Sequence, residues 1–171
     1  MTRSWQRLGM FAAWLLVVAV ALAVVWGHER TLRDGHLVLL ELAPVDPRSL
    51  MQGDYMALRF AVDLQLHQAD GWPDEEGVAP RFAWLALDQQ QRGRLQAVAD
   101  ELPDTEALLA MRIRRQDGGY SVGPNAFFFQ EGTAERYEAA RWGGFRVRAD
   151  GTALLQALYD AELELIGSNQ R

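Results

Sequence analysis

The chain has 171 residues, a formal net charge of −6 and no cysteine, and its 17 basic residues are all arginine. The absence of lysine excludes mechanisms that need a lysine amine, such as Schiff-base catalysis. The absence of cysteine excludes disulfides, thiolate metal sites and cysteine nucleophiles. The acidic balance argues against a nucleic-acid partner, because non-specific binding to the phosphate backbone needs an excess of basic side chains.

The N-terminal segment from Leu8 to Gly27 contains 20 residues and no charged side chain. A helix of that length spans about 30 Å, the thickness of the hydrocarbon core of a bilayer. Arg3 and Arg7 precede the run, whereas the charges that follow it are mixed in sign, so the positive-inside rule places the N-terminus in the cytoplasm. We therefore expect residues 1–27 to be a cytoplasmic tip and a transmembrane anchor in the inner (cytoplasmic) membrane. Residues 28–171 are then one extracytoplasmic globular domain.

A cleaved signal peptide is the alternative interpretation of this segment. Residues 19–21 and 21–23 both have the small-residue pattern of a cleavage site. The apolar run nevertheless continues to Trp26, which is long for the apolar region of a signal peptide. We favour the uncleaved anchor, and a mature chain that begins near Leu22 or Val24 would identify cleavage instead.

The exported domain consists of short apolar runs separated by Gly, Pro and Asp, a pattern typical of strands and turns. The strands that we expect cover residues 37–42, 55–64, 82–87, 95–99, 111–114, 120–122, 126–129, 145–147 and a segment that begins near Leu154. Residues 65–80 read as a loop, and a short helix over residues 95–102 is an alternative to the strand there. Around residues 111–114 apolar and arginine side chains alternate, so one face of that strand is buried and the other carries arginine.

One segment of the domain favours a helix. Residues 133–142 are good helix formers with glutamate early and Arg141 late, and Gly143-Gly144 is expected to end the helix. The fold class that we predict is therefore mainly β (α+β): an N-terminal transmembrane helix, then an antiparallel β-barrel or sandwich-like domain with one helix near 133–142.

A motif lies at the start of the second expected strand. Residues 46–60 read DPRSLMQGDYMALRF, and this segment resembles the signature of the predicted membrane-anchored GDYXXLXY family. Gly53, Asp54, Tyr55 and Leu58 match the signature, and Phe60 stands where it ends in tyrosine, which keeps the ring but removes its hydroxyl. The resemblance extends through residues 127–132, 137–141 and 145–151. It implies a bacterial, membrane-anchored protein and supplies no activity; for some members it implies a multi-pass membrane protein as a genomic neighbour.

The motif has a structural and a functional interpretation. Gly53 permits unusual backbone angles and Asp54 can bond its neighbouring amides, so the pair makes a tight entry to a strand. In the functional interpretation, Asp46, Arg48 and Asp54 form a polar cluster at the mouth of a pocket, with Asp54 as acid, base or ligand anchor. The residues that we single out, as structural or ligand-contacting, are Asp46, Arg48, Gly53, Asp54, Tyr55, Leu58 and Phe60.

A secondary cluster of Glu131, Tyr137 and Arg141 is a weaker candidate. Glu131 and Arg141 lie at opposite ends of the expected helix, where helix electrostatics explains them without a site. The histidines His28, His36 and His67 share no ligand-like spacing, so we expect no metal ion, and no sequence motif indicates a cofactor or a catalytic residue.

The anchor, the missing catalytic motifs and the resemblance lead to one functional hypothesis. We expect a membrane-anchored envelope protein that acts as a non-enzymatic accessory or binding subunit. Its expected partners are the lipid bilayer and a multi-pass integral membrane protein. The alternative is an envelope hydrolase that uses carboxylates such as Asp46, Asp54 or Glu131.

Overall fold

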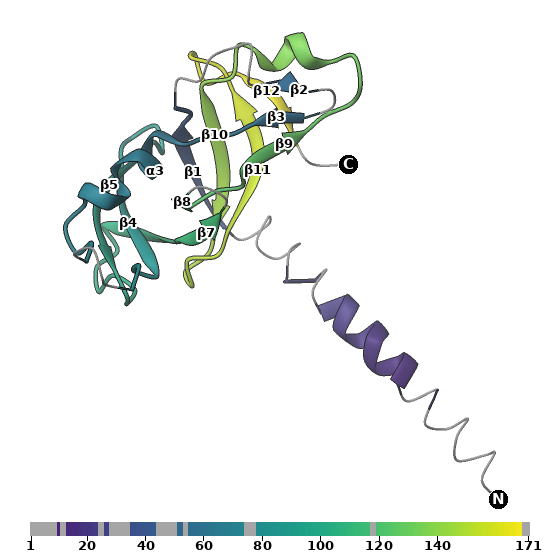
Figure 1. Ribbon diagram of the computed structural model, residues 1–171, viewed down its shortest axis with the longest axis horizontal. Helices are drawn as coiled ribbons and strands as arrows, with labels where there is room; N and C mark the ends of the chain where they lie inside the picture. Colours follow the sequence, from purple (N-terminus) through teal and green to yellow (C-terminus); the bar gives the residue numbers. More distant parts are fainter. Residues whose placement is uncertain are drawn as a thin grey trace, which may run out of the picture.

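The protein folds mainly into antiparallel sheets, with few helices (Figure 1). The computed structural model describes residue 10 and residues 13–23, 26–27, 35–43, 51–52, 55–73, 78–116 and 119–168. The prediction of a mainly β fold is therefore confirmed. Within the described residues the sheets do not close into the barrel that was one of the two predicted architectures. No helix in the described part of the chain is both long enough and apolar enough to cross a membrane.

The largest sheet has four strands in the order β1–β10–β11–β12, and every neighbouring pair is antiparallel. These strands are His36–Glu41, Trp142–Val147, Ala153–Tyr159 and Leu165–Ser168. The strands expected at residues 37–42, 145–147 and near Leu154 are therefore confirmed. Side chains from this sheet, including Val38, Phe145, Val147 and Leu158, are fully buried and form a large part of the core.

A second sheet has the order β5–β4–β6, which are Gly93–Ala99, Phe82–Leu87 and Leu108–Arg112. The strands predicted at residues 82–87 and 95–99 are confirmed, and the alternative helix over residues 95–102 is wrong because residues 95–99 lie in β5, which pairs with β4. The two sheets are connected where the Leu39 N–H donates to the Gln91 carbonyl at 2.8 Å. Beyond this contact β1 and β5 separate, which creates the site described below.

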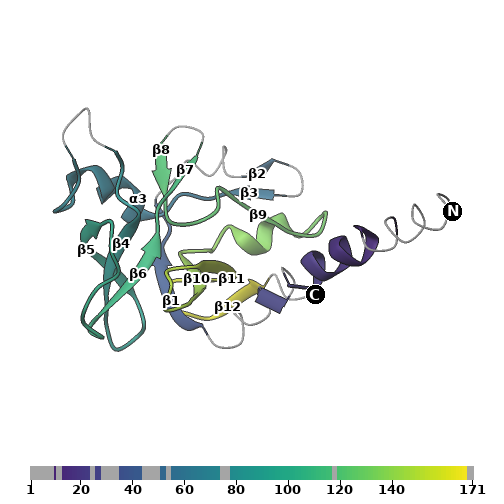
Figure 2. The ribbon, with the colours of Figure 1, turned by 90° about the horizontal axis from the view of Figure 1, so that it is seen from below.

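The remaining strands form two smaller sheets. One has the order β2–β3–β9, made of Met51–Gln52, Tyr55–Ala57 and Ala126–Phe128. The other is a hairpin of β7 and β8, Arg114–Gln116 and Gly119–Ser121. Seen from below, the β2–β3–β9 sheet and the four-stranded sheet lie on opposite sides of the 3-10 helix η2, Ala134–Tyr137 (Figure 2).

The strand predicted over residues 55–64 is wrong in its second half. It ends at Ala57, and the helix α3, Ala61–Gln65, follows and continues into the 3-10 helix η1, Leu66–Gln68. The Phe60 N–H donates to the Asp63 carboxylate at 3.4 Å, a bond that favours the first turn of a helix. Val62 and Leu66 are both buried, and their spacing of four residues is that of one helical face.

The helix predicted over residues 133–142 is confirmed only in part, because only the 3-10 helix η2, Ala134–Tyr137, forms there. Trp142 already pairs with Tyr159 in the sheet, and the Arg141 N–H donates to the Tyr159 carbonyl at 2.8 Å. Gly143 and Gly144 lie inside β10 rather than ending a helix. Glycine fits at both positions because it has no Cβ. An added Cβ would lie 2.9 Å from the Phe60 ring at Gly143 and 2.5 Å from the Tyr159 ring at Gly144.

Candidate binding cleft

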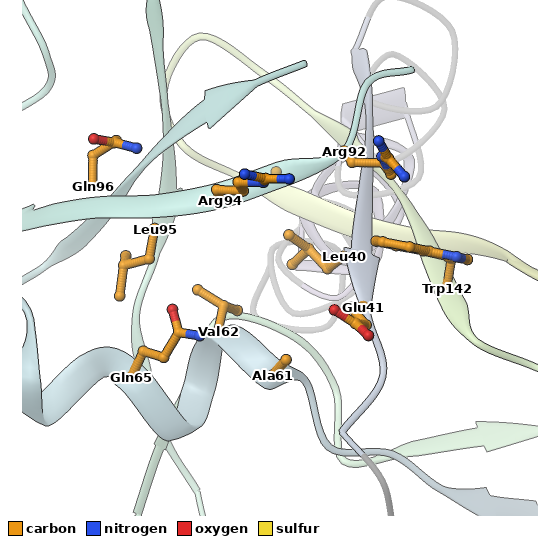
Figure 3. A pocket seen from close by; sticks show the side chains of 11 residues that line it. Leu40, Glu41, Ala61, Val62, Gln65, Arg92, Arg94, Leu95, Gln96 and Trp142 are labelled. Carbon is orange, nitrogen blue, oxygen red and sulfur yellow. The ribbon is translucent and has the colours of Figure 1, made fainter. Parts of the chain in front are cut away.

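A cleft opens where β1 and β5 diverge and α3 lies against both strands. It has a volume of about 610 Å³. Its lining consists of Leu40 and Glu41 from β1, Ala61, Val62 and Gln65 from α3, residues 92–96, and Trp142 from β10. In Figure 3, Arg92 and Trp142 lie together at one end, and Leu95, Val62 and Gln65 lie toward the other. The volume is within the range of small-molecule and peptide-binding pockets.

The floor of the cleft is apolar and tightly packed. Leu40 and Val62 are 1% and 6% exposed, and they belong to the main core. Gly93 fits closely here, since a Cβ would lie 3.0 Å from a Leu40 methyl carbon and 3.1 Å from a Val38 methyl carbon. The glycine therefore allows β5 to approach β1 closely before the two strands separate.

Arg92 is held in place on the rim of the cleft. Its Nε donates to Oδ2 of Asp88 at 2.7 Å, and its Cζ lies 5.7 Å from the centre of the Trp142 ring. The backbone N–H of Arg92 donates to the same carboxylate at 3.0 Å and is the main reason that the pKa of Asp88 lies below its ordinary value. An ion pair combined with a cation–π contact limits the motion of the guanidinium before any ligand arrives.

Two further charges of opposite sign face the cleft. Glu41 and Arg94 are exposed, and within the described residues neither forms an ion pair. Gln65 and Gln96 add amide groups that can both donate and accept hydrogen bonds. The cleft thus presents positive and negative charges, hydrogen-bond donors and hydrogen-bond acceptors above an apolar floor. This arrangement suits an extended polypeptide segment or a polar ligand with an apolar part.

A second, smaller hollow of about 310 Å³ lies beside the buried carboxylate of Asp63. Three donors bond this carboxylate: the Ser121 hydroxyl at 2.7 Å, the Val122 N–H at 3.0 Å and the Phe60 N–H. Burial raises the pKa of Asp63, against the opposing effect of these hydrogen bonds. Asp63 therefore connects the end of β8 and the residue after it to the start of α3. Both of its carboxylate oxygens accept hydrogen bonds from other residues of the chain.

The motif residues that the structure describes are packing residues. Tyr55 pairs with Phe128 across β3 and β9, with their ring centres 5.8 Å apart. Leu58 and Phe60 are buried, and the Phe60 ring meets that of Phe145 edge-on at 5.2 Å. Asp46, Arg48, Gly53 and Asp54 lie outside the described residues, so the predicted polar cluster stays a prediction.

The secondary candidates Glu131, Tyr137 and Arg141 do not converge. Tyr137 is buried, and its ring lies 5.4 Å from Phe127 and stacks on Phe129 at 4.8 Å. Arg141 donates through Nη1 to the carbonyls of Glu138 and Ala140. Glu131 is exposed, and no ion pair joins it to Arg141 in the described part of the chain.

The cleft residues Arg92 and Trp142 and the buried Asp63 were not singled out from the sequence. Arg92 and Trp142 are 50 positions apart, and no local pattern signals a cation–π pair over that separation. Asp63 had a local signal, since an acidic residue three positions after Phe60 can bond the N–H that precedes a helix. Across the described residues, no group of three or more His, Cys, Asp or Glu side chains could hold a metal ion.

The structure is that of a mainly β protein with antiparallel sheets and a cleft of mixed polar and apolar lining between two of them. Residues 17–158 match the family described as GDYXXLXY protein, and the chain therefore belongs to this family. No curated protein and no solved structure matches the chain.

Proposed function

We propose that this chain is a membrane-anchored accessory subunit whose folded part binds a multi-pass integral membrane protein on the extracytoplasmic side. The observation that carries the proposal is the uncharged run of 20 residues from Leu8 to Gly27. Residues 13–23 of this run are helical, and all of them except Val18 are exposed. Large apolar side chains that are exposed within the described part of the chain favour another apolar environment.

The exposed fractions support the lipid bilayer as that environment. Trp14, Leu16 and Leu22 are 63%, 67% and 64% exposed, and Trp26 is 70% exposed. Trp5 and Trp26 lie near the two ends of the run, where interfacial aromatic residues are enriched. Together with Arg3 and Arg7 before the run, this distribution favours a single crossing with the N-terminus in the cytoplasm.

The cleft supports a binding role for the folded part. Its charged and amide side chains belong to three different elements and surround an apolar floor, and Arg92 is held before a ligand arrives. A segment of a partner can place an anionic or amide group against Arg92 and Arg94 and an apolar group against Leu40. The partner that we propose is the multi-pass membrane protein implied for some members of the family.

A hydrolase role for carboxylates, the competing function, has weaker support. Of the carboxylates singled out for that role, Glu131 is exposed and is not one of the residues that line the cleft. Asp63 is buried, but its oxygens accept hydrogen bonds from Ser121, Val122 and Phe60. A carboxylate used in this way holds the structure rather than a substrate.

Co-expression with the candidate multi-pass protein tests the proposal. The full chain is purified in mild detergent by a tag on its partner, and the recovered amounts are quantified. Arg94→Glu reverses a charge in the cleft, and Arg136→Glu makes the same change on the exposed surface of η2. We expect recovery of wild type and of Arg136→Glu, with roughly tenfold less Arg94→Glu. Absence of the wild-type chain from the material recovered with the tagged partner would refute the proposal.

A further inference from the structure

Three arginines from different segments of the chain line a separate hollow of about 470 Å³. Arg81 immediately precedes β4, Arg112 ends β6 and Arg114 begins β7. Phe82, Ile113 and Thr152 complete the lining, which contains no acidic residue. We call this site the arginine pocket. Its concentration of positive charge contrasts with the net charge of −6 for the whole chain.

The backbone of the arginine pocket is fixed by hydrogen bonds between segments. The Ile113 N–H donates to the Arg81 carbonyl at 2.9 Å, and the Arg112 N–H donates to the Gly151 carbonyl at 3.0 Å. Gly151 has a φ of +79°, and a Cβ there would lie 2.8 Å from the Phe82 ring. The pocket is therefore built on paired backbone.

The Phe82 ring positions two of the guanidinium groups. The Cζ atoms of Arg81 and Arg112 lie 5.5 and 5.6 Å from its centre, and the Phe82 side chain is only 4% exposed. Arg112 also donates through Nε to the Asp150 carbonyl at 3.1 Å. The cation–π contact and this single bond restrict the Arg112 guanidinium, and among the described residues its two terminal nitrogens donate no hydrogen bond.

The positive charge of the pocket is not neutralised within the described residues. None of the three arginines forms an ion pair there; the nearby Asp150 instead pairs with Arg148 at 4.0 Å and bonds the Thr152 N–H at 2.9 Å. Partial burial raises the pKa of Asp150, but the bonds from Thr152 and the charges of Arg148 and Arg112 lower it overall. Asp150 is therefore ionised at neutral pH and offsets only part of the charge of four arginines.

We propose that the arginine pocket binds a phosphate group through the guanidinium groups of Arg81, Arg112 and Arg114. Several guanidinium groups around one hollow offer many N–H donors, which match the several acceptor oxygens of a phosphate. A single carboxylate has too few oxygens to accept from all of these donors. A phosphate-bearing solute and the phosphodiester of an anionic lipid present the same chemistry. The inference does not depend on the proposed partner, because it uses residues outside the cleft.

The test measures the thermal unfolding midpoint of the full chain in nanodiscs. One arm adds inorganic phosphate to discs of phosphatidylcholine, with chloride at matched ionic strength as the reference. The other arm replaces part of the phosphatidylcholine by phosphatidylglycerol and omits phosphate. A ligand that binds only the folded state raises the midpoint, and we expect a rise of roughly 3 °C in at least one arm.

Two double variants decide whether the rise comes from the arginine pocket. Arg81→Gln/Arg114→Gln is expected to abolish it, whereas Arg115→Gln/Arg136→Gln, which removes the same charge from exposed positions outside the pocket, is expected to retain it. Arg112→Lys keeps the positive charge but loses the planar guanidinium, so we expect roughly tenfold weaker phosphate binding. This variant provides a second test if Arg81→Gln/Arg114→Gln folds poorly.

Each outcome of this test bears on the proposal. A rise with inorganic phosphate identifies a soluble source, and a rise only with phosphatidylglycerol identifies a lipid headgroup. Both support the proposal when the rise is lost in Arg81→Gln/Arg114→Gln and kept in Arg115→Gln/Arg136→Gln. No rise in either arm, or an equal rise in both double variants, would overturn it.

Discussion

The Ser121 hydroxyl donates a hydrogen bond of 2.7 Å to the carboxylate of Asp63, 58 positions earlier in the chain. The same hydroxyl oxygen accepts the Gly123 N–H at 3.1 Å. This pair joins the end of β8 to the first turn of α3, directly after the motif strand. A helix of only five residues gains little stability of its own, so such long-range bonds hold it in place.

Asp63 makes the stability of the protein depend on pH. Burial, opposed by hydrogen bonds from Ser121, Val122 and Phe60, leaves the pKa of Asp63 above its ordinary value of 3.8. The folded chain therefore holds this proton more tightly than the unfolded chain. The resulting stabilisation is complete below 3.8 and is lost as the pH rises through the folded pKa.

We predict that wild type gains stability relative to Asp63→Asn as the pH is lowered from about 7 toward about 4. Urea unfolding followed by circular dichroism at a series of pH values measures the difference. Asp100→Asn is the matched control, because Asp100 is exposed and accepts one bond from the Arg81 N–H. A difference between wild type and Asp63→Asn that stays constant on acidification would show that Asp63 keeps an ordinary pKa, and a relative loss of wild-type stability would show a lowered pKa.

Ser121→Ala tests the hydrogen bonds of the same loop. The substitution removes the donor to Asp63 and the acceptor of the Gly123 N–H. We expect a loss of about 1–3 kcal/mol in unfolding free energy, since a buried N–H and a buried carboxylate each lose a partner. In a double-mutant cycle with Asp63→Asn, the two losses should not be additive. Strict additivity would mean that the two side chains act independently.

Gly123 and Gly143 enclose the ring of Phe60, the aromatic residue at the end of the family motif. A Cβ would lie 2.3 Å from this ring at Gly123 and 2.9 Å at Gly143. We predict that Gly123→Ala lowers the unfolding free energy by about 2–3 kcal/mol and Gly143→Ala by less, because overpacking forces the core to move. Gly27→Ala, at a position where a Cβ meets nothing within 4 Å, is the control. Equal midpoints in urea for all three variants would contradict the packing described here.

Tyr137 and Glu131 should respond differently to substitution if the secondary cluster is a packing feature. Tyr137 is 8% exposed and contacts the rings of Phe127 and Phe129. Tyr137→Ala should therefore cost about 3–5 kcal/mol, and Glu131→Gln should change stability by less than about 0.5 kcal/mol. Thermal unfolding of both variants provides the comparison. A small effect of Tyr137→Ala would instead leave this tyrosine open to a role in binding.

Local patterns in the sequence were enough to predict most of the strands. The runs at residues 37–42 and 82–87 are almost entirely apolar and are followed by residues typical of turns, and both predicted strands are confirmed. The segments 55–64 and 133–142 were assigned wrongly in part because tertiary contacts decide their structure. Asp63 bonds Phe60 and begins a helix, while Trp142 and Gly143 are taken into the sheet by pairing with β1 and β11.

The cleft could not be predicted from the sequence either, because tertiary contacts also decide which residues line it. Its residues come from β1, α3, β5, β10 and Arg92, which directly precedes β5, and only the tertiary fold brings these segments together. The motif did identify a structurally important region, because Leu58 and Phe60 are core residues. A signature can therefore mark a packing requirement as readily as a binding site.

The most direct test of the account is the position of the two ends of the chain relative to the membrane. The chain contains no cysteine, so Thr2→Cys and Ser168→Cys each introduce a single reactive thiol. Spheroplasts that produce either variant are treated with a membrane-impermeant maleimide, with and without detergent. We predict that Ser168→Cys is labelled without detergent and that Thr2→Cys is labelled only after detergent is added. Labelling of Thr2→Cys in intact spheroplasts, or protection of Ser168→Cys, would contradict a membrane anchor with its folded part outside the cytoplasm.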